Sequence, residues 1–334
     1  MSQASENVVD ALFDDFDQAN SPGAAVIVIK EGKALFAKGY GLADLEKKIP
    51  CATKTSFRLA SVTKQFTAMA VLILAEQGKL SLLERLPKFF SEFPAYGEAI
   101  SLHHLLTHTS GLPDYEDHIP GGTTIPLNDR DVLFILRQQT KTDFPPGAQF
   151  RYSNSGYALL ALIVENVSRK TFPAFVKEKI FDPLGMTNSI AYIAGLSRVP
   201  NRAYGYVNGT RGWELSDQSV TSAVLGDGGI YSSVADLLKW DQALYTEKLV
   251  GRKMLADAFT AHSNESDFKG SGYGYGWYVG NLRGIKRIWH YGSTCGFSTK
   301  IERLPERKLS LVVLSNRRDA EISPIMEKLM ELFW

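Results

Sequence analysis

The chain has 334 residues, which corresponds to one large domain or to about two domains of ordinary size. Apolar residues make up 44% and charged residues 22% of the sequence, so the composition is that of a folded globular protein and excludes wholesale disorder. The 37 Lys and Arg nearly balance the 36 Asp and Glu, and the net charge of +1 gives no electrostatic reason to expect a nucleic-acid or anionic-membrane partner.

The sequence carries no obvious targeting or covalent cross-linking signal. No apolar run approaches the roughly 18 residues needed to span a bilayer, and the first residues lack the basic and apolar segments of a secretory leader. We therefore expect a cytoplasmic protein without a transmembrane segment; the alternative is a periplasmic or secreted protein whose leader has been removed. Cys51 and Cys295 are far apart, so no disulfide framework is expected.

The predicted elements at the two ends of the chain are strands accompanied by helices. Apolar spacing predicts a helix over residues 6–18, and a strand hairpin follows over residues 24–29 and 34–40. Near the other end, strands are predicted over residues 285–289, 298–304 and 309–314, and a last helix over residues 322–332. This arrangement favours one sheet built from both ends of the chain, covered by the terminal helices.

The middle of the chain is predicted to be mainly helical and therefore to be an insertion relative to that sheet. Turns rich in Gly and Pro separate segments whose apolar residues recur at helical spacing. These predicted helices are residues 62–77, 102–107, 129–138, 155–167, 172–181 and 234–245.

The segment Ser61-Val62-Thr63-Lys64 is the strongest candidate for catalysis. A serine hydroxyl is a weak nucleophile unless a neighbouring base takes its proton. Residues three apart share a helix face, so Lys64 can bring its amine to Ser61. The apolar residues that follow predict burial, which lowers the pKa of a lysine from about 10.4 toward that of a useful base.

The S-x-x-K spacing alone is weak, because Ser266 and Lys269 repeat it in a polar loop. The ordinary interpretation of Ser61 is a helix N-cap followed by a surface lysine. Tyr152-Ser153-Asn154 shifts the balance: a phenol can relay protons, and an amide can both donate to and accept from a substrate. The competing interpretation is a turn in which Asn154 caps the next helix.

A third pattern, His290-Tyr291-Gly292, stands at the end of a predicted strand. A strand edge with glycine lets a substrate carbonyl approach backbone N–H groups, as an oxyanion site requires. The ordinary interpretation is a strand-end histidine with one local hydrogen bond.

A separate histidine cluster does not predict a metal site. His104 and His108 are four residues apart, which is compatible with metal binding. No Glu lies between them and no third ligand is evident, so we assign no metal.

The three patterns occur in the order Ser61, Tyr152, His290, and here the chain resembles the serine β-lactamase and penicillin-binding-protein-like superfamily. It is most similar to the class C β-lactamase-type esterases and D-peptidases. Family-like sequence runs from Gly23 to Ser315 and includes residues 105–113, 183–186 and 226–236.

The resemblance implies an α+β fold, an antiparallel sheet flanked by helices with an inserted helical subdomain. We expect residues 1–84 and 219–334 to form the α/β subdomain and residues 85–218 the mainly helical one, with the active site in the cleft between them. No cofactor is implied.

The resemblance also implies roles for individual residues. Ser61 is expected to be the acylated nucleophile, while Lys64 and Tyr152 share proton transfer. The backbone N–H groups of Ser61 and Ser293 are expected to form the oxyanion hole, and Asn154 to orient the substrate. The third motif is His290 and Gly292.

His290 stands where many β-lactamases and transpeptidases have a lysine. A group that is mostly neutral at pH 7 replaces a fixed charge, and a substrate carboxylate would lose a contact of about 1.5–3 kcal/mol. We therefore expect a carboxylesterase for small to medium acyl esters.

The alternatives are a D-amino-acid peptidase or DD-carboxypeptidase, a β-lactamase or an acyltransferase with the same mechanism. An alternative from another class is a non-catalytic module that binds peptidoglycan or a partner. The expected partners are small-molecule esters, amides or lactams.

Overall fold

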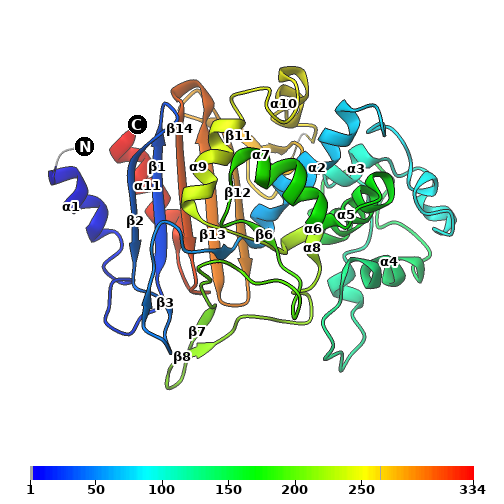
Figure 1. The fold of residues 1–334 in the computed structure, drawn as a ribbon. Helices are drawn as coiled ribbons and strands as arrows, with labels where there is room; N and C mark the ends of the chain where they lie inside the picture. Colours follow the sequence, from blue (N-terminus) through cyan, green and yellow to red (C-terminus); the bar gives the residue numbers. More distant parts are fainter. Residues whose placement is uncertain (1–2, 264) are drawn as a thin grey trace.

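The computed structural model describes residues 3–263 and 265–334. Its centre is a seven-stranded antiparallel sheet in the order β10-β11-β12-β13-β14-β1-β2 (Figure 1). Strand β1 (Ala24–Lys30) pairs with β2 (Lys33–Tyr40) on one side and with β14 (Leu309–Ser315) on the other. The two ends of the chain therefore meet in the middle of one sheet, as the sequence predicted.

Strand β1 is continuously apolar because both faces of the sheet are covered. Successive strand side chains point to opposite faces. Val26 and Val28 belong to the apolar cluster under helices α1 (Gln3–Ala11) and α11 (Ile322–Phe333), whereas Ile27 belongs to the main core on the other face. The figure shows α1 and α11 on one side of the sheet and the remaining helices on the other (Figure 1).

The first helix is shorter than predicted. It ends at Ala11, and the chain continues in turns whose N–H groups bond three residues back, as from Phe13 to Asp10 and from Phe16 to Phe13. These turns keep Phe13 and Phe16 buried, and Phe13 stacks on Tyr40 at 4.5 Å between ring centroids. The apolar spacing therefore predicted correctly that these side chains are buried, but it did not predict where the helix ends.

The strand predicted to end at residue 289 continues to residue 294. Strand β12 (Ile285–Thr294) pairs with β13 (Phe297–Leu304) along its length, so His290 lies inside the strand. On its other edge β12 pairs with β11 (Tyr278–Leu282) only as far as Trp289. The edge beyond Trp289 is not paired to β11, which leaves it available to the site.

Two long buried helices carry the site against this sheet. Helix α2 (Lys64–Glu76) follows a 3-10 turn, η1 (Ala60–Thr63), and packs against α5 (Asn154–Ser168). The predicted helix over residues 172–181 is α6 followed by a π turn over Lys177–Phe181. The other helices are α3 (Leu102–Leu106), α4 (Asp129–Arg137), α6 (Phe172–Val176), α7 (Asp182–Leu184), α8 (Leu225–Gly228), α9 (Val234–Ala243) and α10 (Arg252–Ala258).

Short strands complete the fold. The main sheet ends in β10 (Gly272–Tyr273), and β5, β9 and β6 form a separate three-stranded sheet. The short strands outside the main sheet are β3 (Leu42–Asp44), β4 (Ile49–Pro50), β5 (Phe57–Arg58), β6 (Ile190–Ala191), β7 (Tyr206–Gly209), β8 (Gly212–Leu215) and β9 (Ile230–Ser232). The mixed architecture with a large antiparallel sheet confirms the predicted fold class. The subdomain limits at residues 84 and 218 stay a prediction.

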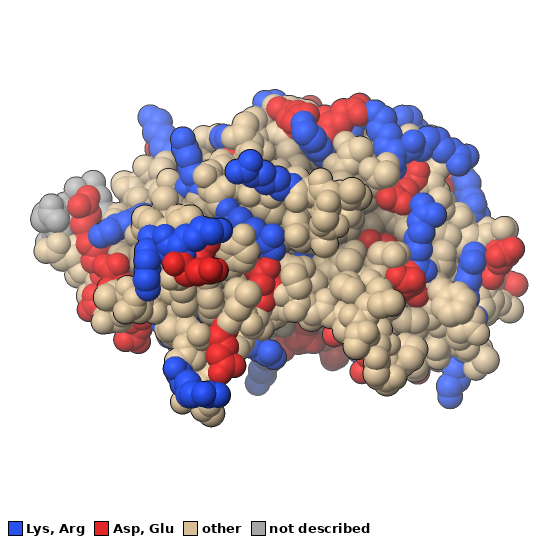
Figure 2. Space-filling model, turned by 60° about the horizontal axis from the view of Figure 1, so that its bottom comes forward, with Lys and Arg blue, Asp and Glu red and all other residues tan. Residues whose placement is uncertain are grey.

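Positive and negative side chains are interspersed over the face seen in Figure 2, which also shows a hollow near its middle. Within residues 3–263 and 265–334, no helix combines the length and apolar content needed to cross a membrane.

Candidate active site

The structure places Lys64 directly beside Ser61. The Lys64 Nζ donates to Ser61 Oγ at 3.2 Å, to Asn154 Oδ1 at 2.7 Å and to the carbonyl oxygen of Asp227 at 3.0 Å. Lys64 begins α2 and Asn154 begins α5, so the packing of these two helices brings the amine and the amide together. The amine therefore contacts the Ser61 hydroxyl and is held in place by hydrogen bonds to Asn154 and to the Asp227 carbonyl oxygen.

Burial lowers the pKa of Lys64 and so favours the neutral amine, which can act as a base. Its side chain is 0% exposed, and this desolvation lowers the pKa of Lys64 to about 8. The nearby carboxylate of Asp227 acts in the opposite direction, since a negative charge favours the ammonium form. Burial also raises the pKa of Asp227, which weakens that opposing charge. The chain thus holds an amine that can lose its proton near neutral pH.

Ser61 is not the N-cap that its spacing also allowed. It lies within η1, whose cap position is Leu59, and α2 begins after Thr63 with no side-chain cap. The preceding residue, Ala60, has a positive φ of 49°, which is uncommon for a residue with a Cβ. Such strain is found where the surrounding structure fixes a functional conformation.

Strand β12 approaches Ser61 closely because Gly292 has no side chain. A Cβ at Gly292 would lie 2.3 Å from the Leu59 carbonyl oxygen and 2.9 Å from the Ala60 Cβ. The hairpin pairs Thr294 with Phe297 and Ser293 with Ser298. In a two-residue hairpin the hydrogen-bonded pairs alternate with non-bonded ones, starting from the pair beside the turn. The Ser293 N–H therefore points away from β13, toward the free edge, where an oxyanion donor is needed.

The Tyr152 hydroxyl is positioned beside the nucleophile in a dry environment. Its oxygen is buried and makes no hydrogen bond of standard geometry, although the Ser61 hydroxyl is close enough to favour the phenolate. Burial is the larger effect and raises the pKa of Tyr152 well above its usual value. The Lys64 ammonium lies 4.9 Å from the centre of the Tyr152 ring. Ser61, Lys64 and Tyr152 thus form one cluster drawn from two chain segments.

Asn154 links Lys64 to Glu116, an acidic residue that the sequence did not indicate as part of the site. It is the first residue of α5 and not its cap, and its Nδ2 donates to Glu116 Oε1 at 2.9 Å. Ser61, Asn154, Glu116 and Ser293 all line a cleft with an empty volume of about 330 Å³. The predicted nucleophile, amide and oxyanion strand therefore converge on one cavity.

The sequence matches the Beta-lactamase family over residues 9–330. The chain belongs to this family. Its relatives include penicillin-binding protein 4* of Bacillus subtilis (strain 168), which is 31% identical over 96% of this chain and 73% of that protein. The structure is also similar to the octameric penicillin-binding protein homologue from Pyrococcus abyssi, with a TM-score of 0.85 and 30% identity over 98% of this chain and 76% of that one.

Two more distant structures share the Beta-lactamase-family fold. D-amino acid amidase from Ochrobactrum anthropi SV3 has a TM-score of 0.84 at 22% identity, covering 99% of this chain and 98% of the other. EstCE1, described as a hydrolase with promiscuous acyltransferase activity, has a TM-score of 0.82 at 22% identity over 99% and 98%. The chain is thus a member of a serine hydrolase family whose fold serves several substrates.

His290 occupies the third motif of the family but is buried and does not line the cleft. Its Nδ1 lies 2.7 Å from the Tyr291 carbonyl oxygen, and its Nε2 lies 2.8 Å from the Tyr273 hydroxyl. A carbonyl only accepts, so Nδ1 donates and Nε2 accepts from Tyr273. Burial, with the nearby charge of Lys64, lowers the pKa of His290 to about 3. The ring is therefore neutral and packs behind Tyr152, at 6.2 Å between centroids, so it supports the site without lining it.

The histidine cluster near residue 105 has structural partners in this family member. His103 Nδ1 lies 3.0 Å from the Tyr275 hydroxyl, and His104 Nδ1 accepts from the Ser101 N–H in a capping box. His108 Nδ1 accepts from the Ser153 N–H. In the part of the chain that the structure describes, no group of three or more His, Cys, Asp or Glu could hold a metal ion.

Three residues of the cleft with charged side chains were not predicted as site residues from the sequence. They are Arg58, Glu116 and Asp227, which reach the cavity from β5, from the 3-10 turn over Tyr115–His118 and from α8. Asp227 Oδ2 accepts from the Tyr115 hydroxyl at 3.0 Å. Arg58 lies three residues before Ser61 in the chain. This short separation was the sequence feature that could have indicated Arg58 as a site residue.

Proposed function

We propose that this chain is a serine carboxylesterase that acts through an acyl-enzyme on Ser61. The observation that carries the proposal is the buried Lys64 amine, 3.2 Å from the Ser61 hydroxyl and with a pKa lowered by burial. Such an amine can take the serine proton as Oγ attacks a carbonyl carbon. In this proposal, Tyr152 passes a proton between the amine and the leaving group.

The steps follow from these positions. Attack of Ser61 Oγ gives a tetrahedral intermediate, and the N–H groups of Ser61 and Ser293 would stabilise its oxyanion. Collapse breaks the ester C–O bond, and the leaving alcohol takes the proton that Ser61 gave up. A water molecule then attacks the acyl-enzyme, gives its proton to the same base, and releases the acid and free Ser61.

An ester substrate is favoured over a β-lactam by the third motif. His290 is neutral and buried, so the third motif offers no cation of the kind a β-lactam carboxylate would meet in the lysine-containing relatives.

The proposal is tested with a fluorophosphonate label and a substrate panel. Mass spectrometry should place the label on Ser61, and Ser61→Ala should abolish both labelling and hydrolysis of p-nitrophenyl butyrate. Ser266→Ala is the matched control, because Ser266 heads the same S-x-x-K spacing with Lys269 exposed. A chromogenic cephalosporin and a D-Ala–D-Ala peptide should turn over slowly. Hydrolysis that survives in Ser61→Ala would refute the mechanism, and fast cephalosporin turnover would refute the substrate class.

An amidase or peptidase for substrates with a free ammonium group is the second candidate. Glu116 lines the cleft beside Asn154 and offers a carboxylate to a cationic substrate. The similarity to D-amino acid amidase is consistent with this candidate. Faster turnover of D-phenylalanine amide than of p-nitrophenyl butyrate would place it first.

A further inference from the structure

Arg58 is a buried cation in the wall of the catalytic cleft. It is 2% exposed and lines the same cavity as Ser61 and Ser293. Its Nη2 donates to the Ser222 carbonyl oxygen at 2.7 Å, and its Nη1 makes a long contact of 3.4 Å with Gln218 Oε1. The Nε has no hydrogen-bond partner. A guanidinium has five N–H donors, so most of the hydrogen-bonding capacity of Arg58 is unused.

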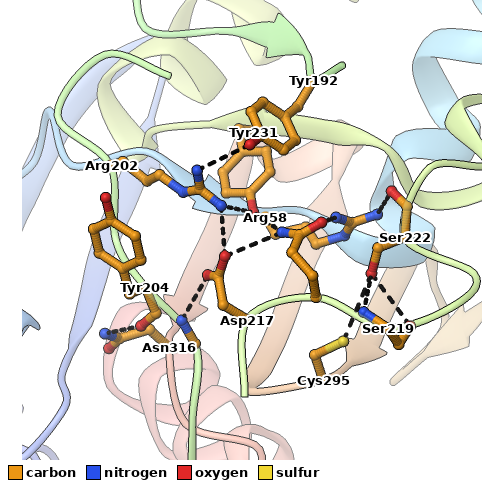
Figure 3. A network of polar contacts seen from close by, with 12 residues as sticks. Arg58, Tyr192, Arg202, Tyr204, Asp217, Ser219, Ser222, Tyr231, Cys295 and Asn316 are labelled. Atoms are coloured by element: carbon orange, nitrogen blue, oxygen red, sulfur yellow. Dashed lines mark hydrogen bonds and ion pairs between the residues drawn. The ribbon is translucent and has the colours of Figure 1, made fainter. Parts of the chain in front are cut away.

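The acidic side chain of the polar network around Arg58 is paired with a different arginine. Arg202 Nη2 lies 2.5 Å from Asp217 Oδ2, and Figure 3 shows Asp217 between the side chains of Arg202 and Arg58. Gln218 separates Arg58 from this carboxylate, because its Nε2 donates to Asp217 at 3.1 Å while its Oε1 accepts from Arg58. Within residues 3–263 and 265–334, no carboxylate lies within 4.0 Å of the Arg58 guanidinium.

The two acidic residues of the cleft do not neutralise Arg58 by contact. Glu116 is hydrogen-bonded to Asn154, and Asp227 accepts from Tyr115. Burial raises the pKa of both carboxyl groups. The cleft therefore has an unpaired guanidinium on the β5 side, and its two acidic side chains are hydrogen-bonded to other residues.

Buried charges in folded proteins are normally paired, because removing an ion from water is costly. The face of Tyr231 lies 5.9 Å from the Arg58 guanidinium carbon, which offers only a weak cation–π contact. An arginine fork matches the two oxygens of a carboxylate. A cation with spare donors beside a nucleophile is what a negatively charged substrate group requires.

We propose that Arg58 forms an anion subsite and that this enzyme prefers esters bearing a carboxylate. The inference rests on the proposed function and narrows its substrate class. The replacement of a lysine by His290 predicted substrates without a carboxylate. Arg58 overturns that expectation, because β5 supplies the positive charge that β12 lacks at this position.

The test compares matched esters that differ in one charge. On the acyl side, p-nitrophenyl hydrogen glutarate is compared with p-nitrophenyl pentanoate. On the leaving-group side, 3-(butanoyloxy)benzoate is compared with its carboxamide. We expect wild type to favour the carboxylate in at least one pair, measured as the ratio of the two kcat/KM values. Arg58→Gln should reduce that ratio about tenfold or more, mainly through KM, since a charge-assisted contact is lost.

The control is Arg287→Gln, which removes an arginine that is paired with Glu302 and does not line the cleft, and it should leave the ratio unchanged. Equal ratios in wild type and Arg58→Gln for both pairs would overturn the proposal, as would a wild-type preference for the neutral ester in both pairs. If wild type hydrolyses none of the four esters, the esterase function fails on its own. Calorimetric titration with 3-acetamidobenzoate then decides the subsite: binding lost in Arg58→Gln supports it, and equal or absent binding overturns it.

Discussion

Substituting Gly292 by Ala tests the contact between the oxyanion strand and the nucleophile turn. The added Cβ would lie 2.3 Å from the Leu59 carbonyl oxygen, whereas ordinary contact begins at 3.4 Å. Because the clash is with backbone, no side-chain rotation relieves it. Strand β12 and the η1 turn must therefore move apart by about 1 Å, which separates the N–H of Ser293 from that of Ser61.

The size of the effect follows from this displacement. A misplacement of about 1 Å costs on the order of 10²-fold in rate, and loss of one oxyanion donor costs about 10²–10³-fold in kcat. Overpacking costs about 1–3 kcal/mol in unfolding free energy. We expect Gly292→Ala to fold with a lower Tm and to hydrolyse p-nitrophenyl butyrate with kcat reduced about 10²-fold.

The assay measures kcat by release of p-nitrophenol and Tm by circular dichroism. Gly121→Ala is the control, since a Cβ at Gly121 would meet nothing within 4 Å, and it should match wild type in both measurements. A Gly292→Ala enzyme with wild-type kcat and Tm would show that β12 does not set the oxyanion geometry.

Three further predictions concern the proton-transfer groups. The rate should rise with pH through about 8, because Lys64 accepts the serine proton only when neutral; a pH–rate profile that rises only near pH 10 would contradict a lowered pKa. Asp227→Asn should move that rise to lower pH, since the ionised carboxylate favours the Lys64 ammonium form; an upward move in the same profile would be inconsistent with this coupling. Tyr152→Phe should lower kcat by about 10²–10⁴-fold with no loss of Tm, because the buried hydroxyl leaves no hydrogen-bond partner behind; unchanged kcat would remove Tyr152 from the mechanism.

For His290, the sequence predicted the charge of the side chain but not its hydrogen-bond partners. The motif predicts a group that is mostly neutral at pH 7, because the usual pKa of histidine lies below 7, and burial lowers the pKa of His290 further. The motif did not indicate that both ring nitrogens are already bonded, to Tyr273 and to the Tyr291 carbonyl. Strand β12 continues past His290 and turns the ring inward, which depends on its pairing with β13.

The sequence by itself determined the features that depend on residues close in the chain. The three-residue spacing of Ser61 and Lys64, the apolar helix after them and the double-sided apolar strand β1 are local patterns, and the folded chain has each of them. The assembly of the sheet from both ends also followed, because strands and helices were recognisable by their periodicity.

Only the tertiary structure decided how the site is charged. Lys64 meets Asn154 and Asp227 across separations of 90 and 163 residues. Arg58 is left without a carboxylate because Asp217 pairs with Arg202 instead. The packing of helices and strands decides which charged groups form pairs, because burial and distance set electrostatic free energies. Neither burial nor distance can be derived from residues that are close in the sequence.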